Sequence, residues 1–333
     1  MDGLSKPSPP YFKGQRFTIQ SHIPPEPTLV TRGCCKNSDA ARKERERLHP
    51  VERCLRHPPL PGINGSFAVD LEICGILQVG DGHCAQVFMA EILKTSPDFQ
   101  GLEKGKRLVA KAYDPLYFND DDGYLNPFLC VDQHYTHEAR AYEVLSDLQN
   151  HMIPKFYGSF SLGIPVDPSR ARTVRLILIE HVPGLSMQAA IPSDYSQPVR
   201  QQIMKSVVDL DSLVYERDIL LTDLRPSNII LVENGPSDEQ RRLIFVDFGG
   251  AVFGRIRDDL DIRRPELFLG TYISPLLRWS TAPTLFFDDW IDWDWQSWLE
   301  AEYQHTAVTV TDEMRKTYLL DYVPSPTPEL TSK

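Results

Sequence analysis

The sequence predicts an α+β fold, with an antiparallel sheet in the first half of the chain and helices in the second. The sheet is indicated by three short apolar runs, at residues 71–77, 84–92 and 107–113, which are separated by glycine-containing turns as in an antiparallel meander. The helices are indicated by residues 199–214, where apolar side chains recur every three or four positions and define one face of a long amphipathic helix.

Four further elements complete this order. Residues 138–148 carry apolar side chains at helical spacing and predict a helix after the third strand. Residues 173–180 (TVRLILIE) are almost continuously apolar, which predicts a strand buried on both faces. Residues 228–232 and 243–246 are short apolar runs that flank a polar turn, and we expect two strands there.

The two ends of the chain differ in composition from the rest. Residues 1–65 are rich in Pro, Ser, Lys and Arg and contain a charge run at 41–49 without an apolar stripe, so we expect a disordered or loosely docked arm. Residues 324–333 (PSPTPELTSK) predict a disordered tail. Between them we expect the ordered part of the chain, over residues 66–323.

Composition narrows the class of protein. The 333 residues are 41% hydrophobic, which is enough to form a core and excludes a collagen, a coiled coil or a wholly disordered chain. The formal net charge of -11 comes without a basic cluster, so we expect no nucleic-acid partner. The 6 cysteines form no CxxC pair, which favours reduced thiols. Without a secretory signal or an apolar run of about 18 residues, we expect an intracellular protein, cytoplasmic or nuclear, with no membrane segment.

A glycine-rich loop lies between the first two predicted strands. Residues 80–87 read GDGHCAQV, a GxGxxAxV pattern in which Gly80 and Gly82 would let the backbone approach a ligand and direct its amides at phosphate oxygens. A plain hairpin turn explains the same residues when the loop is considered alone.

A lysine and a glutamate form the second candidate pair. Lys111 lies at the end of the third predicted strand, where a solvated edge lysine is the alternative interpretation. Glu138 lies on the same helical stripe as Tyr142 and Leu145, and a carboxylate on a core-facing stripe needs a cation. We therefore expect Lys111 to pair with Glu138 and to point its ammonium at phosphate.

Two short acidic segments complete the set. Asp223 and Asn228 lie five apart in the loop that follows the long helix, so they can direct a carboxylate toward a substrate hydroxyl and an amide oxygen toward a metal. Asp247 ends an apolar strand and precedes Phe248 and two glycines, which suits a magnesium ligand on a hinge. Capped turns are the alternative interpretation of both segments.

In this order, over roughly residues 71–251, the motifs resemble those of the protein kinase family: glycine-rich loop, strand-three lysine, helix-C glutamate, catalytic loop and DFG motif. The resemblance implies a two-lobed fold, with an antiparallel-sheet N-lobe over residues 66–182 and a mainly helical, abbreviated C-lobe over residues 183–323. The aromatic segment at 286–298 also resembles the C-termini of uncharacterised fungal kinase-like proteins.

The resemblance implies roles for individual residues. Asp223 would accept the hydroxyl proton, and Arg225 would stand near the transferred phosphoryl group. Asn228 and Asp247 would bind magnesium. The nucleotide-binding residues, which include the hinge between the lobes, would be Gly80, Gly82, Val87, Lys111, Glu138, Glu180 and Val182.

The chain also departs from the family pattern. Leu221 and Thr222 replace the histidine and arginine that ordinarily precede the catalytic aspartate, so the chain is of the non-RD type and activation by loop phosphorylation is not expected. Ala85 replaces the third glycine of the loop, and Leu276 replaces the glutamate of the APE motif. The 58 residues after Pro275 are too few for a standard C-lobe, which puts protein substrates in doubt more than nucleotide binding.

Three functions remain open from the sequence. The first is an ATP- and magnesium-dependent phosphotransferase acting on a Ser/Thr hydroxyl or a small-molecule alcohol. The second is a pseudokinase or nucleotide-binding interaction module without transfer activity, and the third is an acidic interaction protein without a nucleotide site. The aromatic and acidic segment at 286–298 fits a cap over the second lobe, and a cage for a cationic ligand is its alternative.

Overall fold

The computed structural model describes residues 5–30, 33–97, 101–118, 123–232, 242–253, 269–280 and 286–319. The chain divides into two compact units. The first comprises Met1–Ala189 and Leu221–Ile256, and the second comprises Ala190–Leu220 and Arg257–Lys333.

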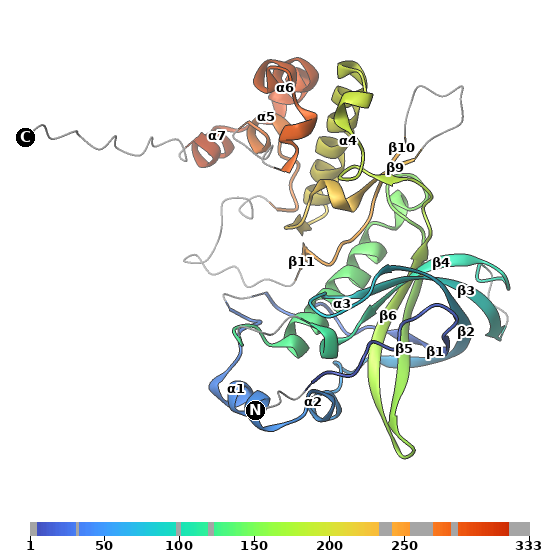
Figure 1. The fold of residues 1–333 in the computed structure, drawn as a ribbon. Coiled ribbons are helices and arrows are strands. Elements are labelled where there is room, and N and C mark those ends of the chain that lie inside the picture. Colours follow the sequence, from blue (N-terminus) through green and yellow to red (C-terminus); the bar gives the residue numbers. More distant parts are fainter. Residues whose placement is uncertain are drawn as a thin grey trace, which may run out of the picture. The chain divides into compact units, whose positions relative to one another are not determined.

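The first unit is built on a closed barrel with the strand order β1-β2-β3-β4-β6-β5 (Figure 1). Its strands are β1 (Arg16–Ile23), β2 (Ile63–Gln78), β3 (Gln86–Ser96), β4 (Arg107–Tyr113), β5 (Phe156–Asp167) and β6 (Arg170–Glu180). Neighbouring strands are antiparallel throughout. The predicted combination of an antiparallel sheet with helices is therefore confirmed.

Burial follows the alternation of side chains along these strands. In β3, for example, Phe88, Ala90 and Ile92 are buried at every second position and point into the barrel. In β6 the run from Val174 to Ile179 is buried on both faces, because the inner face fills the barrel and helix α3 (Pro127–Val144) packs outside. The apolar run at 173–180 predicted this double burial.

The N-terminal segment differs from the predicted loose arm. β1 pairs with β2 from Arg16↔Glu72 to Ile23↔Ile63, and with β5 at Gln20↔Ser161, so it closes the barrel. Ile19 in this strand is 0% exposed. β1 is therefore part of the core, although its flanks are charged and rich in proline and its partners lie far along the chain.

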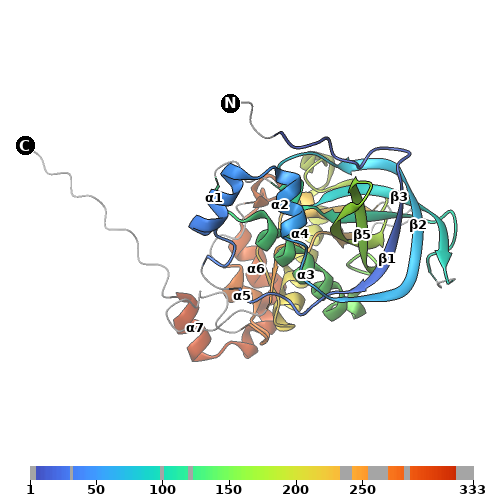
Figure 2. The same cartoon turned by 90° about the horizontal axis from the view of Figure 1, so that it is seen from below.

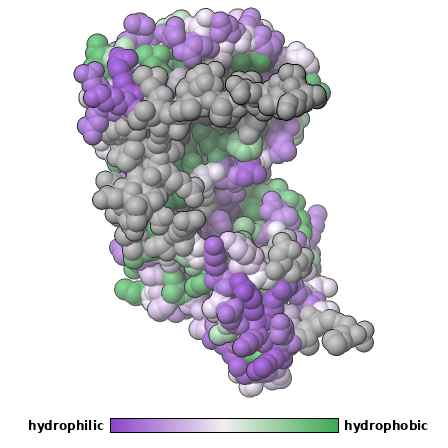
Figure 3. Space-filling model, turned by 90° about the vertical axis from the view of Figure 1, so that its left-hand side faces the viewer, coloured by the Kyte–Doolittle hydropathy of each residue, from purple (hydrophilic) through white to green (hydrophobic). Residues whose placement is uncertain are grey.

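Two helices follow β1 in the same arm: α1 (Asp39–Arg47) and α2 (Pro50–Arg56). They lie beside each other on the side of the barrel where α3 packs (Figures 1 and 2). No residue of α1 is buried, and Figure 3 shows a strongly hydrophilic patch where this helix lies. The charge run at 41–49 is thus the solvated face of a helix that Ser38 caps by accepting from the Ala41 amide.

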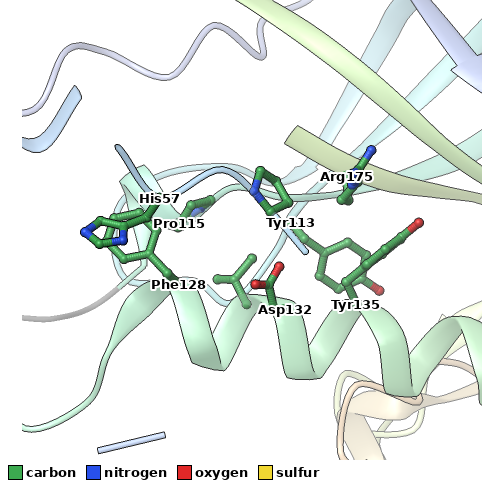
Figure 4. A pocket seen from close by; sticks show the side chains of 9 residues that line it. His57, Tyr113, Pro115, Phe128, Asp132, Tyr135 and Arg175 are labelled. Carbon is green, nitrogen blue, oxygen red and sulfur yellow. The ribbon is translucent and has the colours of Figure 1, made fainter. Parts of the chain in front are cut away.

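The segment after α2 seals a small pocket between α3 and the barrel. This pocket has a volume of about 10 Å³ and lies among residues of the arm, β4, β6 and α3. Figure 4 shows Asp132 and Tyr135 rising from α3, with His57 of the arm on one side and Arg175 of β6 on the other. The Leu60 amide donates to Asp132 (3.2 Å) and the Leu60 carbonyl accepts from Arg175 (3.0 Å), so the arm is bonded to both walls.

The first unit extends beyond the predicted domain boundary at 182/183. It contains several short strands that follow this boundary in the sequence. β9 (Ile229–Val232) lies between β7 (Leu185–Ser186) and β10 (Arg242–Phe245), and β11 (Ala251–Val252) pairs with β8 (Leu220–Leu221), of which Leu221 belongs to this unit. The Phe245 amide donates to the carbonyl of Met152 (2.8 Å), which lies in the segment between α3 and β5. These backbone bonds group the loop that follows the long helix with the barrel.

The second unit is helical. It contains α4 (Gln197–Glu216), α5 (Pro275–Arg278), α6 (Trp295–Tyr303) and α7 (Asp312–Leu319). The predicted helix at 199–214 is α4, and the predicted tail at 324–333 lies outside the described residues. Among the described helices, none combines the length and the apolar character needed to cross a membrane.

The aromatic segment at 286–298 packs within the second unit. Phe287, Trp290 and Trp298 are buried, and the Trp295 and Trp298 rings lie 4.8 Å apart. The guanidinium of Arg200 pairs with Asp292 and lies over the Trp293 ring at 5.8 Å. These contacts fit the predicted cap better than a cage, because a cation of the protein itself lies over one of the aromatic faces.

The role of β1 in the core can be tested with Ile19→Ala. We expect this variant to lose about 2–4 kcal/mol of unfolding free energy, because a buried aliphatic side chain is removed from a closed barrel. Chemical denaturation measures the loss. The matched control is Ile23→Ala in the same strand, where the side chain is 59% exposed and a change within about 0.5 kcal/mol is expected. Equally small losses of unfolding free energy in both variants would instead support the loosely docked arm predicted from the sequence.

His22 of β1 should make the fold sensitive to acid. Burial, with a contribution from Arg175, lowers the pKa of His22 to about 4, against 6.5 in the unfolded chain. As the pH falls from 6.5 toward 4, His22 becomes protonated in the unfolded chain but stays neutral in the folded chain. The free energy of unfolding therefore decreases over that window. Allowing for partial solvation, we expect a loss of about 1–2 kcal/mol.

Asp132, whose pKa burial raises to about 6, titrates in the same window with the opposite sign. Stability is therefore compared between wild type and His22→Asn at each pH, by urea denaturation at about pH 7 and about pH 4.5. The difference in unfolding free energy between the two proteins should change in favour of His22→Asn at the lower pH. A gap that does not change with pH would contradict the assignment.

Candidate active site

A buried ammonium lies between two carboxylates at the centre of the candidate site. Lys111, in β4, donates to both oxygens of Glu138 in α3 at 2.7 and 2.6 Å, and to Oδ1 of Asp247 at 2.9 Å. The side chains of Lys111 and Glu138 are 7% and 0% exposed, whereas that of Asp247 is 43% exposed. The structure thus brings together the pair expected from the sequence and adds the aspartate to it.

The Glu138 carboxylate has two more donors. The Tyr113 hydroxyl donates to Oε2 at 2.6 Å, and the Phe248 amide donates to Oε1 at 3.3 Å. Tyr113 lies two residues beyond Lys111, so both side chains leave β4 on the same face. With these contacts a carboxylate that is out of solvent keeps its hydrogen bonds, as a buried charge must.

Lys111 and Asp247 stabilise each other's charged forms, whereas burial, with a smaller contribution from Asp247, raises the pKa of Glu138 despite the nearby Lys111. Burial acts to lower the pKa of Lys111, but the carboxylates of Asp247 and Glu138 outweigh it and raise that pKa above the ordinary lysine value. Burial likewise acts to raise the pKa of Asp247, but Lys111 outweighs it and leaves that pKa below the ordinary value. Lys111 and Asp247 are therefore both ionised at neutral pH.

The turn after Asp247 is strained and well supported. Asp247 has φ of 70°, a left-handed conformation that costs energy for a residue other than glycine. Its Oδ1 accepts from the Gly249 amide at 3.1 Å. Phe248 is buried, and its ring meets Tyr142 edge-on at 5.2 Å.

The loop before β9 holds its polar side chains together. Asp223 forms an ion pair with Arg225, and Asn228 Nδ2 donates to the Asp223 carbonyl at 2.9 Å. The Ser227 hydroxyl donates to Asn228 Oδ1 at 3.1 Å. Arg225 therefore lies beside the carboxylate that the sequence casts as a proton acceptor.

The glycine-rich loop is bonded at both of its glycines. Gly80 and Gly82 have φ of 153° and 91°, and a Cβ at either would meet nothing within 4 Å, so backbone conformation is what favours glycine there. The buried Gln86 side chain accepts from the Gly80 amide (2.7 Å) and donates to the Gly80 carbonyl (2.8 Å). The Gly82 amide donates to the Tyr117 carbonyl at 2.9 Å.

One cleft of about 520 Å³ collects most of the predicted site residues. Its lining includes Gly82, Val87, Lys111, Glu138, Asp223, Arg225, Asn228 and Asp247. Gly80, Glu180 and Val182 are not among its lining residues. The Glu180 amide, expected at an adenine-binding hinge, donates to the Lys155 carbonyl at 2.8 Å.

Several lining residues were missed by the sequence analysis. Tyr113 and His134 line the cleft, and His134 binds the Gly249 carbonyl. Thr222 lines it as well, and both its amide (3.1 Å) and its hydroxyl (2.8 Å) donate to the Gly250 carbonyl. His134 lies one helical turn before Glu138, a spacing that was visible in the sequence.

The oxygen donors in this cleft fit a magnesium ion better than a transition metal. Asp247 supplies a carboxylate and Asn228 an amide oxygen, the ligand types that hard cations prefer. Within the described part of the chain, no group of three or more His, Cys, Asp or Glu could hold a metal ion. An ion held by Asp247 and Asn228 would complete its shell with water and substrate phosphate, as magnesium commonly does.

Comparisons with known proteins add little to this geometry. No protein-family model matches the chain, and no curated protein matches it. Among solved structures, the chain is similar to Rad53 1-466 in complex with AMP-PNP, with 18% identity and a TM-score of 0.33. The match covers 52% of this chain and 36% of that one. The functional argument therefore depends on the site's own residues.

The hydroxyl of Tyr113 is testable by Tyr113→Phe, which keeps the ring that packs 5.4 Å from Tyr135 and removes the bond to Glu138. We expect about 1.5–3 kcal/mol lower unfolding free energy, the usual range for a hydrogen bond to a charged group. Tyr124→Phe, at a tyrosine that is 52% exposed, is the control and should change little. If the two variants are equally stable in urea denaturation, the bond to Glu138 carries no stability.

Proposed function

We propose that the protein is an ATP- and magnesium-dependent phosphotransferase of the protein kinase-like, two-lobed fold. It moves the γ-phosphate of ATP to the hydroxyl of a serine or threonine residue or of a small-molecule alcohol. The observation that carries the proposal is the Lys111–Glu138–Asp247 cluster, which opens into the same cleft as Asp223 and Asn228. An ammonium, a carboxylate ligand and a second carboxylate around one cleft match the requirements of phosphoryl transfer.

Each side chain has a task in this proposal. Lys111, held by Glu138, neutralises the phosphates, and Asp247 and Asn228 hold the metal, which when bound shields the charge of the phosphates. Asp223 accepts the proton of the acceptor hydroxyl as its oxygen bonds to phosphorus and the bond to the leaving ADP breaks. Arg225, which forms an ion pair with Asp223, would stabilise charge on the transferred group.

A nucleotide-binding module without transfer activity is the second candidate, and two observations favour it. The Gly80 and Gly82 amides, which would face phosphates, already donate to Gln86 and to the Tyr117 carbonyl. The Asp223 carboxylate is already paired with a guanidinium. A protein with these bonds can hold a nucleotide on Lys111 and Asp247 while lacking a ready proton acceptor.

Transfer of label from γ-labelled ATP tests the proposal and separates the candidates. Wild type is assayed with magnesium against a protein mixture and, in parallel, against a mixture of small alcohols. Asp223→Asn should lower the rate by about 10²–10⁴-fold, as expected for loss of a general base. Lys111→Ala should weaken transfer and nucleotide binding together, and the exposed Lys94→Ala is the matched control with wild-type turnover.

Thermal denaturation with and without ATP and magnesium accompanies the assay. A shift without transfer would leave only the binding module. Neither shift nor transfer, in protein that melts cooperatively, would end both proposals. Transfer that survives in Asp223→Asn and Lys111→Ala alike would place the chemistry elsewhere.

A further inference from the structure

Helix α3 presents a stripe of three polar side chains to the turn after Asp247. His134, His137 and Glu138 are spaced by three and four residues, so they lie on one face of the helix. Glu138 serves Lys111 and the Phe248 amide, as described above. The two histidines bind the backbone immediately beyond.

His134 binds the first carbonyl of this backbone. Its Nδ1 lies 2.8 Å from the Gly249 carbonyl, and because a carbonyl only accepts, Nδ1 carries the proton and donates. The packing here is close: a Cβ at Gly249 would lie 3.2 Å from His134 Nδ1. A side chain at this position would therefore crowd the imidazole ring.

His137 lies 0% exposed between this backbone and the N-terminal arm. Its Nδ1 is 2.7 Å from the Ala251 carbonyl and 3.3 Å from the Phe253 amide. Its Nε2 is 2.9 Å from the Thr28 carbonyl and 3.3 Å from the Thr28 hydroxyl. Each nitrogen thus faces both a donor and an acceptor, so the neutral ring is bonded on both sides in either tautomer.

Side chains thus lie within hydrogen-bond distance of all three consecutive carbonyls after Phe248. Gly249 accepts from His134 and Gly250 accepts from the Thr222 hydroxyl, and Ala251 accepts from His137 in the tautomer that carries its proton on Nδ1. These bonds brace a turn whose first residue, Asp247, is held in the left-handed region. In the kinase pattern the histidine before the catalytic aspartate supports this turn, and here Leu221 stands at that position.

We propose that His134 and His137 are positioning residues that hold the Asp247 turn from helix α3, in place of support from the catalytic loop. The inference rests on the proposed function, because its consequence is that metal binding by Asp247 depends on these histidines. Glu138 orients the ammonium of Lys111, and the two histidines orient the carboxylate of Asp247. One helix therefore positions both charged groups.

This role can be tested with two replacements of His134 that place a side-chain amide at different positions. His134→Asn puts a donor where Nδ1 stands, whereas His134→Gln puts it where Nε2 stands and should leave the Gly249 carbonyl unbound. The quantity measured is the magnesium concentration at half-saturation of ATP binding, by calorimetry. ATP affinity in the presence of a chelator is measured alongside, because it reports how strongly Lys111 contributes to ATP binding when no metal is bound.

We expect His134→Gln to raise the half-saturating magnesium concentration about tenfold, the equivalent of roughly one hydrogen bond. His134→Asn should stay within about threefold of wild type, and chelated ATP affinity should stay within about twofold in both variants. His137→Asn, which keeps the donor toward Ala251 and gives up the contact with Thr28, should behave like His134→Asn.

Three outcomes would overturn the inference. Equal magnesium requirements in His134→Gln and wild type would show that the bond to Gly249 does not position Asp247. Equal loss in the Asn and Gln variants would show that ring shape rather than the donor matters, and a matching loss of chelated ATP affinity would make His134 a ligand contact. If wild type itself binds no ATP with magnesium, the proposed function fails first, and this result is distinct from the other three.

Discussion

The burial of Lys111 with Glu138 is the constraint on which the site depends. An ammonium and a carboxylate that are both out of solvent are stable only with close partners, and separating them costs several kcal/mol. Helix α3 must therefore pack against β4 at the height where Glu138 meets Lys111. Tyr113 and the Phe248 amide complete the shell of Glu138, and Asp247 is then drawn to the exposed side of the ammonium.

The barrel and the N-terminal segment hold α3 at this height. The helix begins at the Asn126 cap, and just before it Lys36 forms a bridge with Leu125 while the Asn37 side chain binds the Gly123 and Leu125 carbonyls. Farther along the helix, His137 contacts Thr28. The arm thus touches α3 near its start and again beside the Lys111–Glu138 pair, which makes the arm part of the scaffold of the candidate site.

Local patterns predicted much of this. Alternation and glycine turns indicated β2, β3 and β4, helical spacing indicated α4, and a carboxylate on an apolar stripe predicted the pairing of Glu138 with Lys111. The closure of the barrel by β1 could not be predicted, because the strand pairs with residues about 50 and 140 positions away, and its flanks have the composition of a solvated tail. His134 and His137 were missed because a histidine has no obligatory partner, and only the backbone carbonyls that face them reveal their role.

The closure of the barrel has a consequence for how this protein can meet others. An open sheet exposes a row of unpaired amides and carbonyls along its outer strands, to which a peptide or a second copy can attach. Here β1 joins β2 to β5, so each of the six described barrel strands has a neighbour on both sides. Strand addition to the barrel would have to displace one of its strands, and displacement of β1 would at the same time expose Ile19 and loosen the segment that reaches Thr28.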